Sequence, residues 1–324
     1  MNVAFCVQAF NPCQWYRMLE PARVFPGARL VLGDPRHALP LRGKEVVQFS
    51  YVTTRAEVEA MEALRAAGAV LALDYDDDVV RMGADADVVR AAIRLADVVT
   101  VSTEHLGGVF GQLAPGAPWA VLPNRIDTLA WEPGSFHWFT PVIAYAGSKA
   151  HTRDFEYVAP DVWNVMRRRP SCRLRLLGCD EITVPEDLAG RVVQASRAPL
   201  ATHRLAFAAL QADIALAPLQ PNEFNRGRSE LKFLQFAAMG VPVVATMMPP
   251  YAVIEHGVTG FTVPPSLSWR APLLNLLDDS ALRRRIGDAA RNFVFSRYDL
   301  TRDAPVREAI YQQAINRARA RERN

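Results

Sequence analysis

Residues 213–244 read DIALAPLQPNEFNRGRSELKFLQFAAMGVPVV, and this stretch decides the fold. The apolar runs 213–219 and 243–245 are typical of strands buried on both faces of a sheet. Between them, a polar loop over 220–228 leads into a helix that we expect Ser229 to cap and Gly240 to end. A strand, a helix and a second strand in this order predict one right-handed crossover of a parallel sheet.

The start of this helix predicts an anion site. Lys232 stands where a capping box would place Glu or Gln, so we expect no acidic side chain at the positive end of the helix. Free amides, the helix dipole, Lys232, Arg226 and Arg228 together favour a phosphate. Gln235 projects from the same face one turn later and can bond a hydroxyl group. A phosphate beside a polyol describes a nucleotide; the alternative is a solvated basic loop before an ordinary core helix.

Five pieces of the chain carry a family resemblance. They are AYAGSKAHTRDF (144–155), LRLLG (174–178), ADIALAPL (212–219), FNRGRSELKFLQFAAMGVPVVA (224–245) and PPYAVIEHGVTGFTV (249–263). In this order they resemble the donor-binding half of GT-B glycosyltransferases, specifically the large retaining family numbered 4, the glycosyl transferases group 1.

The resemblance implies an α/β fold of GT-B architecture, with two Rossmann-like, doubly wound domains that face each other across a cleft. It implies an N-terminal acceptor-binding domain over 1–135, a C-terminal nucleotide-sugar-binding domain over 136–300 and a helix over 301–324 that braces the N-terminal domain. The implied reaction is transfer of a sugar from a nucleotide sugar to an acceptor hydroxyl with retention, without a metal or another cofactor. Lys232 and Arg228 would stabilise the departing diphosphate.

The resemblance also implies the donor contacts. A glycine-containing turn after a strand faces the distal phosphate, a loop before residue 200 takes the nucleobase, and the residues around the helix start hold phosphate and ribose. Gln235 stands where the family has a ribose-binding glutamate, and the partner glutamate, eight residues earlier, is replaced by Gly227. The paired-glutamate signature is therefore absent. The implied donor contacts are Gly147, Ser148, Lys149, His151, Pro199, Asn225, Arg226, Ser229 and Gln235.

The N-terminal half alternates short apolar runs with helical segments, which predicts a doubly wound parallel sheet. We expect strands at 2–7, 30–32, 46–51, 69–73, 98–101 and 121–124, and helices at 15–25, 55–67 and 87–95. The loop at 8–14 contains no glycine, which excludes a dinucleotide-binding fingerprint in this half.

Polar residues near the strand ends are the candidate acceptor contacts, because parallel sheets collect ligands there. We expect Arg17, Asp76, Asp77 and His105 on the acceptor side, although Arg17 and His105 also suit a packing role. The acidic cluster 74–78 leaves open hydrogen bonds to the acceptor, a weak divalent metal site, a general base or a solvated helix cap. A metal is the least favoured of these, because the phosphate-binding features lie in the other half.

Composition narrows the class of protein. Half of the residues are hydrophobic, yet no run approaches the roughly 20 apolar residues of a membrane span, and no signal peptide is apparent. The 4 cysteines lack zinc-finger or disulfide-scaffold spacing, so we expect a reduced, cytoplasmic protein. The net charge of +3 is concentrated in the last helix, which does not favour nucleic acid as a partner. The arginines of that helix leave open a contact with the inner face of a membrane.

Three alternatives to a saccharide-directed transferase remain. A nucleotide-sugar epimerase shares the architecture, and a glycosyltransferase acting on modified DNA bases would need a basic acceptor face. A catalytically silent nucleotide-sugar binding protein is favoured by the missing glutamate pair. The sequence leaves open the nucleotide, the sugar and the acceptor, which we expect to be a saccharide or another hydroxyl compound.

Overall fold

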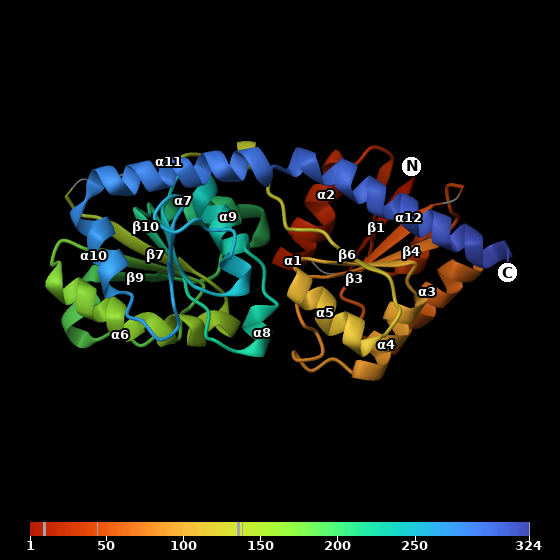
Figure 1. Cartoon of the computed structure of the whole chain (residues 1–324), viewed down its shortest axis with the longest axis horizontal. Coiled ribbons are helices and arrows are strands. Elements are labelled where there is room, and N and C mark those ends of the chain that lie inside the picture. The colour runs from red at the N-terminus through yellow and green to blue at the C-terminus, as the bar shows by residue number, and fades with distance from the viewer. Residues whose placement is uncertain (9–10, 44, 135–136, 138, 324) are drawn as a thin grey trace. The chain divides into compact units, whose positions relative to one another are not determined.

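The structure is a computed structural model that describes residues 1–8, 11–43, 45–134, 137 and 139–323. Its contacts divide the chain into two compact units (Figure 1). The first unit holds residues 1–126, 227–229 and 299–324, and the second holds residues 127–226 and 230–298. The expected boundary between residues 135 and 136 falls outside the described residues.

The first unit is built on a six-stranded parallel sheet with the order β2-β1-β3-β4-β5-β6. The last strand ends at Val121 and not at residue 124 as expected. The amide of Leu122 still bonds the carbonyl of Val101 at 2.7 Å, but Pro123 has no amide to continue the ladder. The strands are β1 (Val3–Val7), β2 (Ala28–Leu32), β3 (Val46–Ser50), β4 (Val70–Tyr75), β5 (Val98–Val101) and β6 (Trp119–Val121).

The second unit repeats this plan with a six-stranded parallel sheet of order β12-β11-β10-β7-β8-β9. Strand β10 pairs in parallel with β11, with Ala215 opposite Val243, which confirms the crossover predicted for residues 213–245. The strands are β7 (Val142–Ala146), β8 (Arg173–Leu177), β9 (Val192–Ala195), β10 (Ile214–Ala217), β11 (Val243–Thr246) and β12 (Phe261–Val263).

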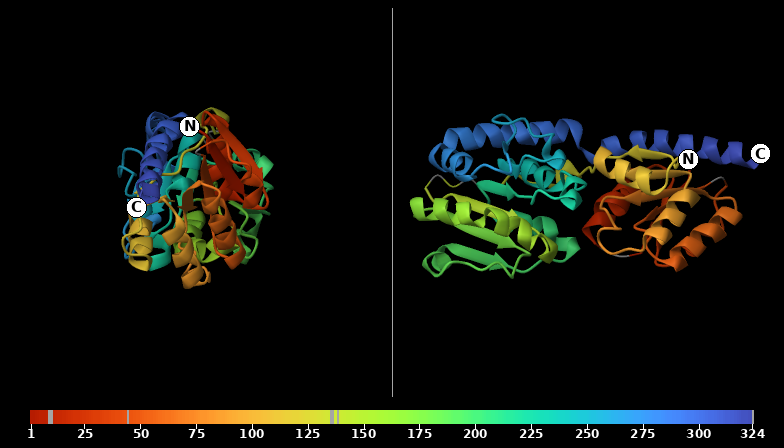
Figure 2. Two further views of the ribbon diagram at one scale, coloured as in Figure 1. Left: turned by 90° about the vertical axis from the view of Figure 1, so that its right-hand side faces the viewer. Right: turned by 60° about the horizontal axis from the view of Figure 1, so that its bottom comes forward.

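Helices cover both faces of the first sheet, because alternate residues of each strand point to opposite sides. One face packs on α3 (Arg55–Ala66), α4 (Ala86–Leu95) and α5 (Glu104–Leu113). The other packs on the segment around α2 (Glu20–Val24) and on α12 (Asp303–Arg323), which run on the same side of the sheet (Figures 1 and 2). Helix α5 was not expected from the sequence; Thr103 caps it by accepting the amide of Leu106 at 3.3 Å.

The second sheet is enclosed in the same way. Helices α6 (Thr152–Arg168) and α10 (Arg270–Asp278) form one apolar core with it. Helix α9 (Leu231–Ala238) packs against α11 (Ser280–Arg297), and Phe233 meets Phe293 with ring centroids 6.2 Å apart. Gly240 ends α9 as expected, with the left-handed φ of +74° that favours glycine. The second unit also contains α7 (His203–Ala209) and α8 (Glu223–Arg226).

The first helical segment is less regular than the helix expected at 15–25. It begins with α1 (Pro12–Gln14), continues as a π-helical turn (Trp15–Leu19) and ends as α2. Pro21 has no amide to bond the carbonyl of Arg17 four residues earlier. That carbonyl instead accepts a hydrogen bond from Nη2 of Arg307 at 3.3 Å. The irregular turn is therefore tied to α12.

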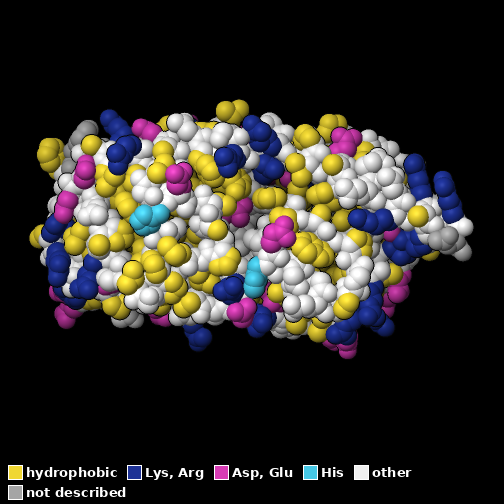
Figure 3. All heavy atoms as spheres, in the orientation of Figure 1, with side chains coloured by type: hydrophobic (Ala, Val, Ile, Leu, Met, Phe, Trp, Pro, Cys, Tyr) yellow, Lys and Arg dark blue, Asp and Glu magenta, His cyan; other side chains and the backbone are white. Residues whose placement is uncertain are grey.

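The last helix carries a basic end. Basic side chains project around the carboxyl end of α12 (Figure 3), where the sequence places Arg317, Arg319 and Arg321. Arg317 donates to the carbonyl of Asp97 at 3.3 Å, and Arg321 pairs with the Asp97 carboxylate. Two of these arginines thus hold α12 to the first sheet, and the expected membrane contact stays untested. Among the described residues, no helix has both the length and the apolar character to cross a membrane.

Candidate functional site

A glycine-lined turn closes the carboxyl end of β7 in the second unit. The amide of Gly147 donates to the carbonyl of Leu177 at 2.9 Å, which draws the turn against the end of β8. Gly178 has φ +78°, and a Cβ there would lie only 2.2 Å from the carbonyl oxygen of Gly147. Both the left-handed backbone and this close approach require glycine at position 178. The predicted turn Gly147–Ser148 is therefore held by its neighbour strand.

Lys232 lies beside this turn. Its Nζ is 6.0 Å from the centroid of the Tyr145 ring, and the Tyr145 hydroxyl donates to the carbonyl of His151 at 3.0 Å. Burial raises the pKa of the Cys179 thiol to about 11, while the charge of Lys232 opposes that rise. The Cys179 thiol in turn contacts the carbonyl of Ser148 at 3.7 Å. Lys232 thus lies near Tyr145 and Cys179, which contact His151 and Ser148 respectively.

Asp154 joins this turn to the loop after β10. Its Oδ2 lies 3.0 Å from Nδ1 of His151, and its Oδ1 accepts from the amide of Gln220 at 2.9 Å and from Nδ2 of Asn225 at 2.8 Å. Burial raises the pKa of the Asp154 carboxyl. The hydrogen bonds from His151 and Gln220 and the charges of His151 and Lys232 outweigh burial, so the net pKa lies below its ordinary value.

The start of α9 differs from the expectation. The helix begins at Leu231, and its N-cap position is taken by Glu230, which is buried, and not by Ser229. The hydroxyl of Ser229 instead accepts from Nδ2 of Asn124 at 2.8 Å within the first unit. The prediction that the positive end of this helix lacks an acidic side chain is therefore wrong. A carboxylate at this position weakens the attraction of the helix dipole for an anion, so the predicted anion site loses that support.

The other predicted donor contacts lie as follows. Lys149 is exposed and pairs with Glu181, and Arg226 is exposed with its Nε 3.7 Å from Glu223. Pro199 is exposed at the start of a short 3₁₀ turn. Gln235 is buried in α9, one turn after Lys232.

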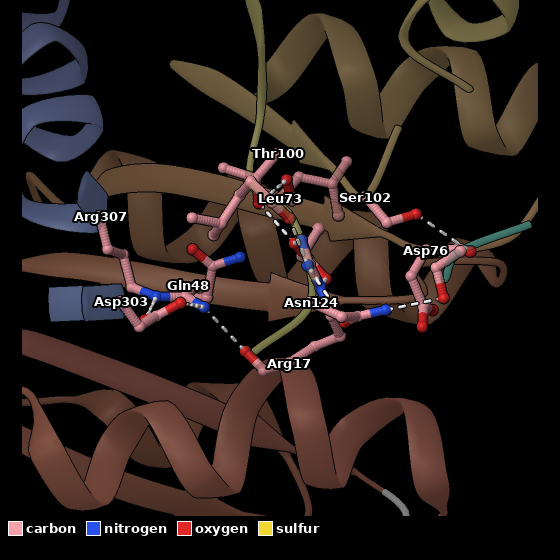
Figure 4. Close-up of polar contacts among 12 residues, drawn as sticks. Arg17, Gln48, Leu73, Asp76, Thr100, Ser102, Asn124, Asp303 and Arg307 are labelled. Atoms are coloured by element: carbon pink, nitrogen blue, oxygen red, sulfur yellow. Dashed lines mark hydrogen bonds and ion pairs between the residues drawn. The ribbon is translucent and has the colours of Figure 1, made fainter. Parts of the chain in front are cut away.

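In the first unit, Arg17 is buried inside a charge network (Figure 4). Its guanidinium makes two hydrogen bonds to the Asp74 carboxylate, at 2.9 Å and 2.6 Å, and a third to the carbonyl of Leu122. Thr100 donates to the same carboxylate at 2.5 Å. The donors of Arg17 are therefore used within the core, which contradicts the expectation that this side chain meets an acceptor.

Asp76 and Asp77 lie together beyond β4, as expected, and both contact the hydroxyl of Tyr51. The distance to Oδ2 of Asp77 is 3.0 Å, and the contact with Asp76 is shorter. Tyr51 has φ +58°, a left-handed conformation that is uncommon outside glycine and occurs often at functional sites. Burial and the charge of Asp77 raise the pKa of Asp76 to about 7, against the opposing charge of Arg17 and the hydrogen bond from Tyr51.

Cys13 and Arg228 complete this cluster. Ligand atoms of Cys13, Asp76 and Asp77 lie within 4.8 Å of one another, close enough to hold a metal ion. Burial and the two carboxylates raise the pKa of the Cys13 thiol well above its ordinary value, so metal binding would have to displace its proton. Nη1 of Arg228 lies 3.3 Å from Oδ1 of Asp77 within the first unit, whereas Lys232 belongs to the second.

A cavity of about 450 Å³ opens at the ends of β3 and β4 in the first unit. Cavities of this size accommodate small ligands, and this one lies where parallel sheets bind them. His105 lies elsewhere, half-buried in the first turn of α5. The cavity is lined by Tyr51, Thr53, Val79, Met82, Gly83, Ala84 and Asp85.

Sequence reasoning missed Asp154, Tyr51 and Cys13. Asp154 had a signal, because a residue three positions after His151 at a helix start shares its face. Tyr51 had a weak signal, because it ends the strand expected at 46–51, whereas Cys13 had none; their meeting with Asp76 depends on segments far apart in the chain.

Comparison with known proteins supports the resemblance drawn from the sequence. Residues 140–279 match the family described as glycosyl transferases group 1. No curated protein sequence matches the chain.

Solved structures share the fold at low identity. A glycosyltransferase from Rickettsia africae ESF-5 has 12% identity and a TM-score of 0.71, covering 97% of this chain and 98% of that chain. HepE from Anabaena, in complex with UDP, has 16% identity and a TM-score of 0.68, covering 96% and 100%. Sucrose-phosphate synthase from Thermosynechococcus elongatus has 16% identity and a TM-score of 0.62, covering 83% and 73%. The predicted GT-B fold and the resemblance to its glycosyltransferases are thus confirmed.

Proposed function

We propose that this chain, with a glycosyl transferases group 1 match over residues 140–279, transfers a sugar from a nucleotide-sugar donor to an acceptor hydroxyl. The observation that carries the proposal is the meeting of Lys232 with the glycine turn after β7. A cation beside backbone amides suits a diphosphate. Structures of the similar HepE contain UDP and UDP-glucose, which supports a donor of that class.

The donor diphosphate binds the second unit in this proposal. The amide of Ser148 and the side chains of His151 and Lys232 surround the phosphates, and Gly147 contributes by holding the turn, because its own amide bonds the carbonyl of Leu177. Asn225 shapes the neighbouring loop through its bond to Asp154. The other assigned contacts are Lys149 and Arg226 at the phosphates, Pro199 at the nucleobase, Ser229 in the loop before α9 and Gln235 at the ribose.

The reaction breaks the bond between the anomeric carbon and the phosphate oxygen and forms a bond to the acceptor oxygen. We propose that Lys232 and Arg228 stabilise the negative charge that develops on the leaving diphosphate. The acceptor hydroxyl gives its proton to a phosphate oxygen, so the products are a glycoside and a nucleoside diphosphate. The acceptor attacks from the face that the phosphate leaves, which retains the configuration, and no metal takes part.

The acceptor in this proposal is a saccharide or another hydroxyl compound. Asp76 and Asp77 accept hydrogen bonds from its hydroxyl groups, and His105 is a further contact of the acceptor. The proposal omits Arg17, because its guanidinium bonds Asp74 in the core.

The first experiment measures release of nucleoside diphosphate from a panel of nucleotide sugars, without an added acceptor. We expect slow release from one donor, a large loss in Lys232→Ala and no effect of a chelator. Arg167→Ala is the control, since Arg167 is an exposed cation of the same unit that pairs with Asp187.

Three other outcomes of this experiment would contradict parts of the proposal. Binding of nucleotide sugars with no release, even when saccharide acceptors are added, would favour a silent binding protein. Activity that chelation removes and Mg²⁺ restores would contradict the metal-free reaction. A product of inverted configuration in the proton NMR spectrum would contradict retention.

A further inference from the structure

Asp154 lies in the first turn of α6, but its carboxylate accepts hydrogen bonds from residues outside that helix. Its side chain is buried, and three donors from outside α6 converge on its two oxygens. His151 belongs to the turn after β7, and Gln220 and Asn225 belong to the segment after β10. Since β7 and β10 are hydrogen-bonded neighbours, one carboxylate ties together the two loops at the carboxyl edge of the second sheet.

The carboxylate also determines the protonation of the His151 ring. A carboxylate can only accept, so Nδ1 of His151 carries a proton and Nε2 is the nitrogen that faces away from Asp154. The loop after β10 is held just as firmly. Asn225 donates to Asp154 and to the carbonyl of Gln220 at 3.0 Å, and its own amide donates to Oδ1 of Asn222 at 2.8 Å.

We propose that Asp154 is the positioning residue of the diphosphate site: it orients His151 and clamps the loop after β10 against the turn after β7. The inference rests on the proposed function, because it assumes that Ser148, His151 and Lys232 contact the diphosphate. Asp154 itself touches no phosphate, since its oxygens are occupied by protein donors. Its contribution is to fix groups before the ligand arrives.

If Asp154 acted only through its charge, its removal would strengthen anion binding. A buried negative charge whose field reaches Lys232 weakens anion binding. If Asp154 acts by positioning, its removal weakens binding. The direction of the change therefore separates the two.

Asp154→Asn tests this with little change in shape. The amide oxygen can still accept from Gln220 and Asn225, but the amide nitrogen donates to Nδ1 of His151 and moves the ring proton to Nε2. We expect binding of inorganic pyrophosphate and of UDP, measured by calorimetry, to weaken about tenfold, the scale of one charge-assisted hydrogen bond. Asp154→Ala also releases the loop and weakens binding further.

A spectroscopic readout accompanies the affinities. Long-range ¹⁵N–¹H spectra of histidine-labelled protein report which ring nitrogen is protonated, and His151→Gln assigns the signal among the 6 histidines. We expect the Nδ1–H form in the wild-type protein and the Nε2–H form in Asp154→Asn. A structural role limited to stabilising α6 would leave the tautomer of a folded variant unchanged.

Asp161→Asn is the matched control. Asp161 lies in the same helix, and its Oδ2 accepts the amide of Trp269 at 2.7 Å, so its loss perturbs α6 without touching the two loops. We expect no change in binding. Unchanged or tighter binding in Asp154→Asn, or an Nε2–H signal in the wild type, would overturn the inference. A wild-type protein that binds neither pyrophosphate nor UDP, GDP or ADP would instead refute the proposed function.

Discussion

The carboxyl edges of the two sheets differ in chemistry although the sheets are built alike. Each sheet has six parallel strands, and each gathers polar side chains where strands end. At the first edge, buried carboxylates accept hydrogen bonds from Arg17 and Tyr51. At the second, Asp154 and Lys232 lie beside a glycine turn with backbone amides.

The difference shows that a parallel sheet determines where a ligand site lies, whereas the residues at its edge determine the charge of that site. The carboxylates of the first edge are bonded within the unit, as the Arg17 and Asp74 pair illustrates. The second edge combines a cation with amides held by glycine. We therefore expect hydroxyl groups at the first edge and phosphate at the second.

The largest effect should come from the Arg17 and Asp74 pair, whose side chains are 1% and 0% exposed. Removing one partner leaves the other charge buried and unpaired. We expect Arg17→Met to lower the free energy of unfolding by about 3–5 kcal/mol in a urea titration. The double variant Arg17→Met, Asp74→Leu should recover much of that loss. Nucleotide affinity should not change in either variant while it remains folded.

A stable Arg17→Met protein with a raised KM for the acceptor would contradict a purely structural role for Arg17. It would return Arg17 to the acceptor side, where the sequence analysis placed it.

The next effect concerns Asp76, whose pKa is raised from 3.8 to about 7 by burial and the charge of Asp77. Between those values the folded protein keeps a proton that the unfolded chain has lost. Its stability therefore falls as the pH rises through that window, by at most about 1.4 kcal/mol per pH unit. Asp76→Asn removes this slope, so its stability relative to the wild type should increase from pH 4 to pH 7.

Urea titrations across that range measure the slope. Tyr51→Phe sharpens the test, because the hydrogen bond from Tyr51 lowers the pKa of Asp76. Without that bond, the loss of stability should extend to higher pH. Parallel pH curves for wild type and Asp76→Asn would show that Asp76 is ionised throughout.

At the second edge, Lys232→Ala should remove a charge-assisted contact of about 1.5–3 kcal/mol from binding of nucleoside diphosphates. Calorimetry measures the loss, and Arg228→Ala serves as the comparison. The structure pairs Arg228 with Asp77 in the first unit, so a loss in both variants would mean that Arg228 also reaches the phosphates. Unchanged affinity in both variants would remove the diphosphate from this edge.

The sequence predicted the sheets well, because buried parallel strands read as short apolar runs. Strand β5 has the predicted limits, residues 98–101. The errors fell at ends and irregular turns. Pro123 shortened β6, and Pro21 accompanies a π-helical turn, because a missing amide has consequences that depend on tertiary partners such as Arg307.

The site was predictable only where its residues are close in sequence. The turn at Gly147 and the position of Lys232 follow from local patterns. The burial of Arg17 and the cap at Glu230 do not, since they depend on which elements pack together. The roles of the site residues remain predictions that the experiments above address.

The smallest expected effect concerns Gln235, which we assign to the ribose in place of a glutamate. Glutamine and glutamate reach equally far, and both offer a carbonyl-type acceptor to a sugar hydroxyl. The neutral amide makes a bond weaker by roughly 1 kcal/mol, but it avoids a negative charge one turn from Lys232. Gln235→Glu should therefore change nucleotide affinity by no more than about tenfold. Gln235→Leu should cost more, because ribose hydroxyls would face an apolar surface in a buried position. Equal dissociation constants for the Leu and Glu variants would show that this residue does not touch the ribose, and would leave Lys232 as the better-supported donor contact of α9.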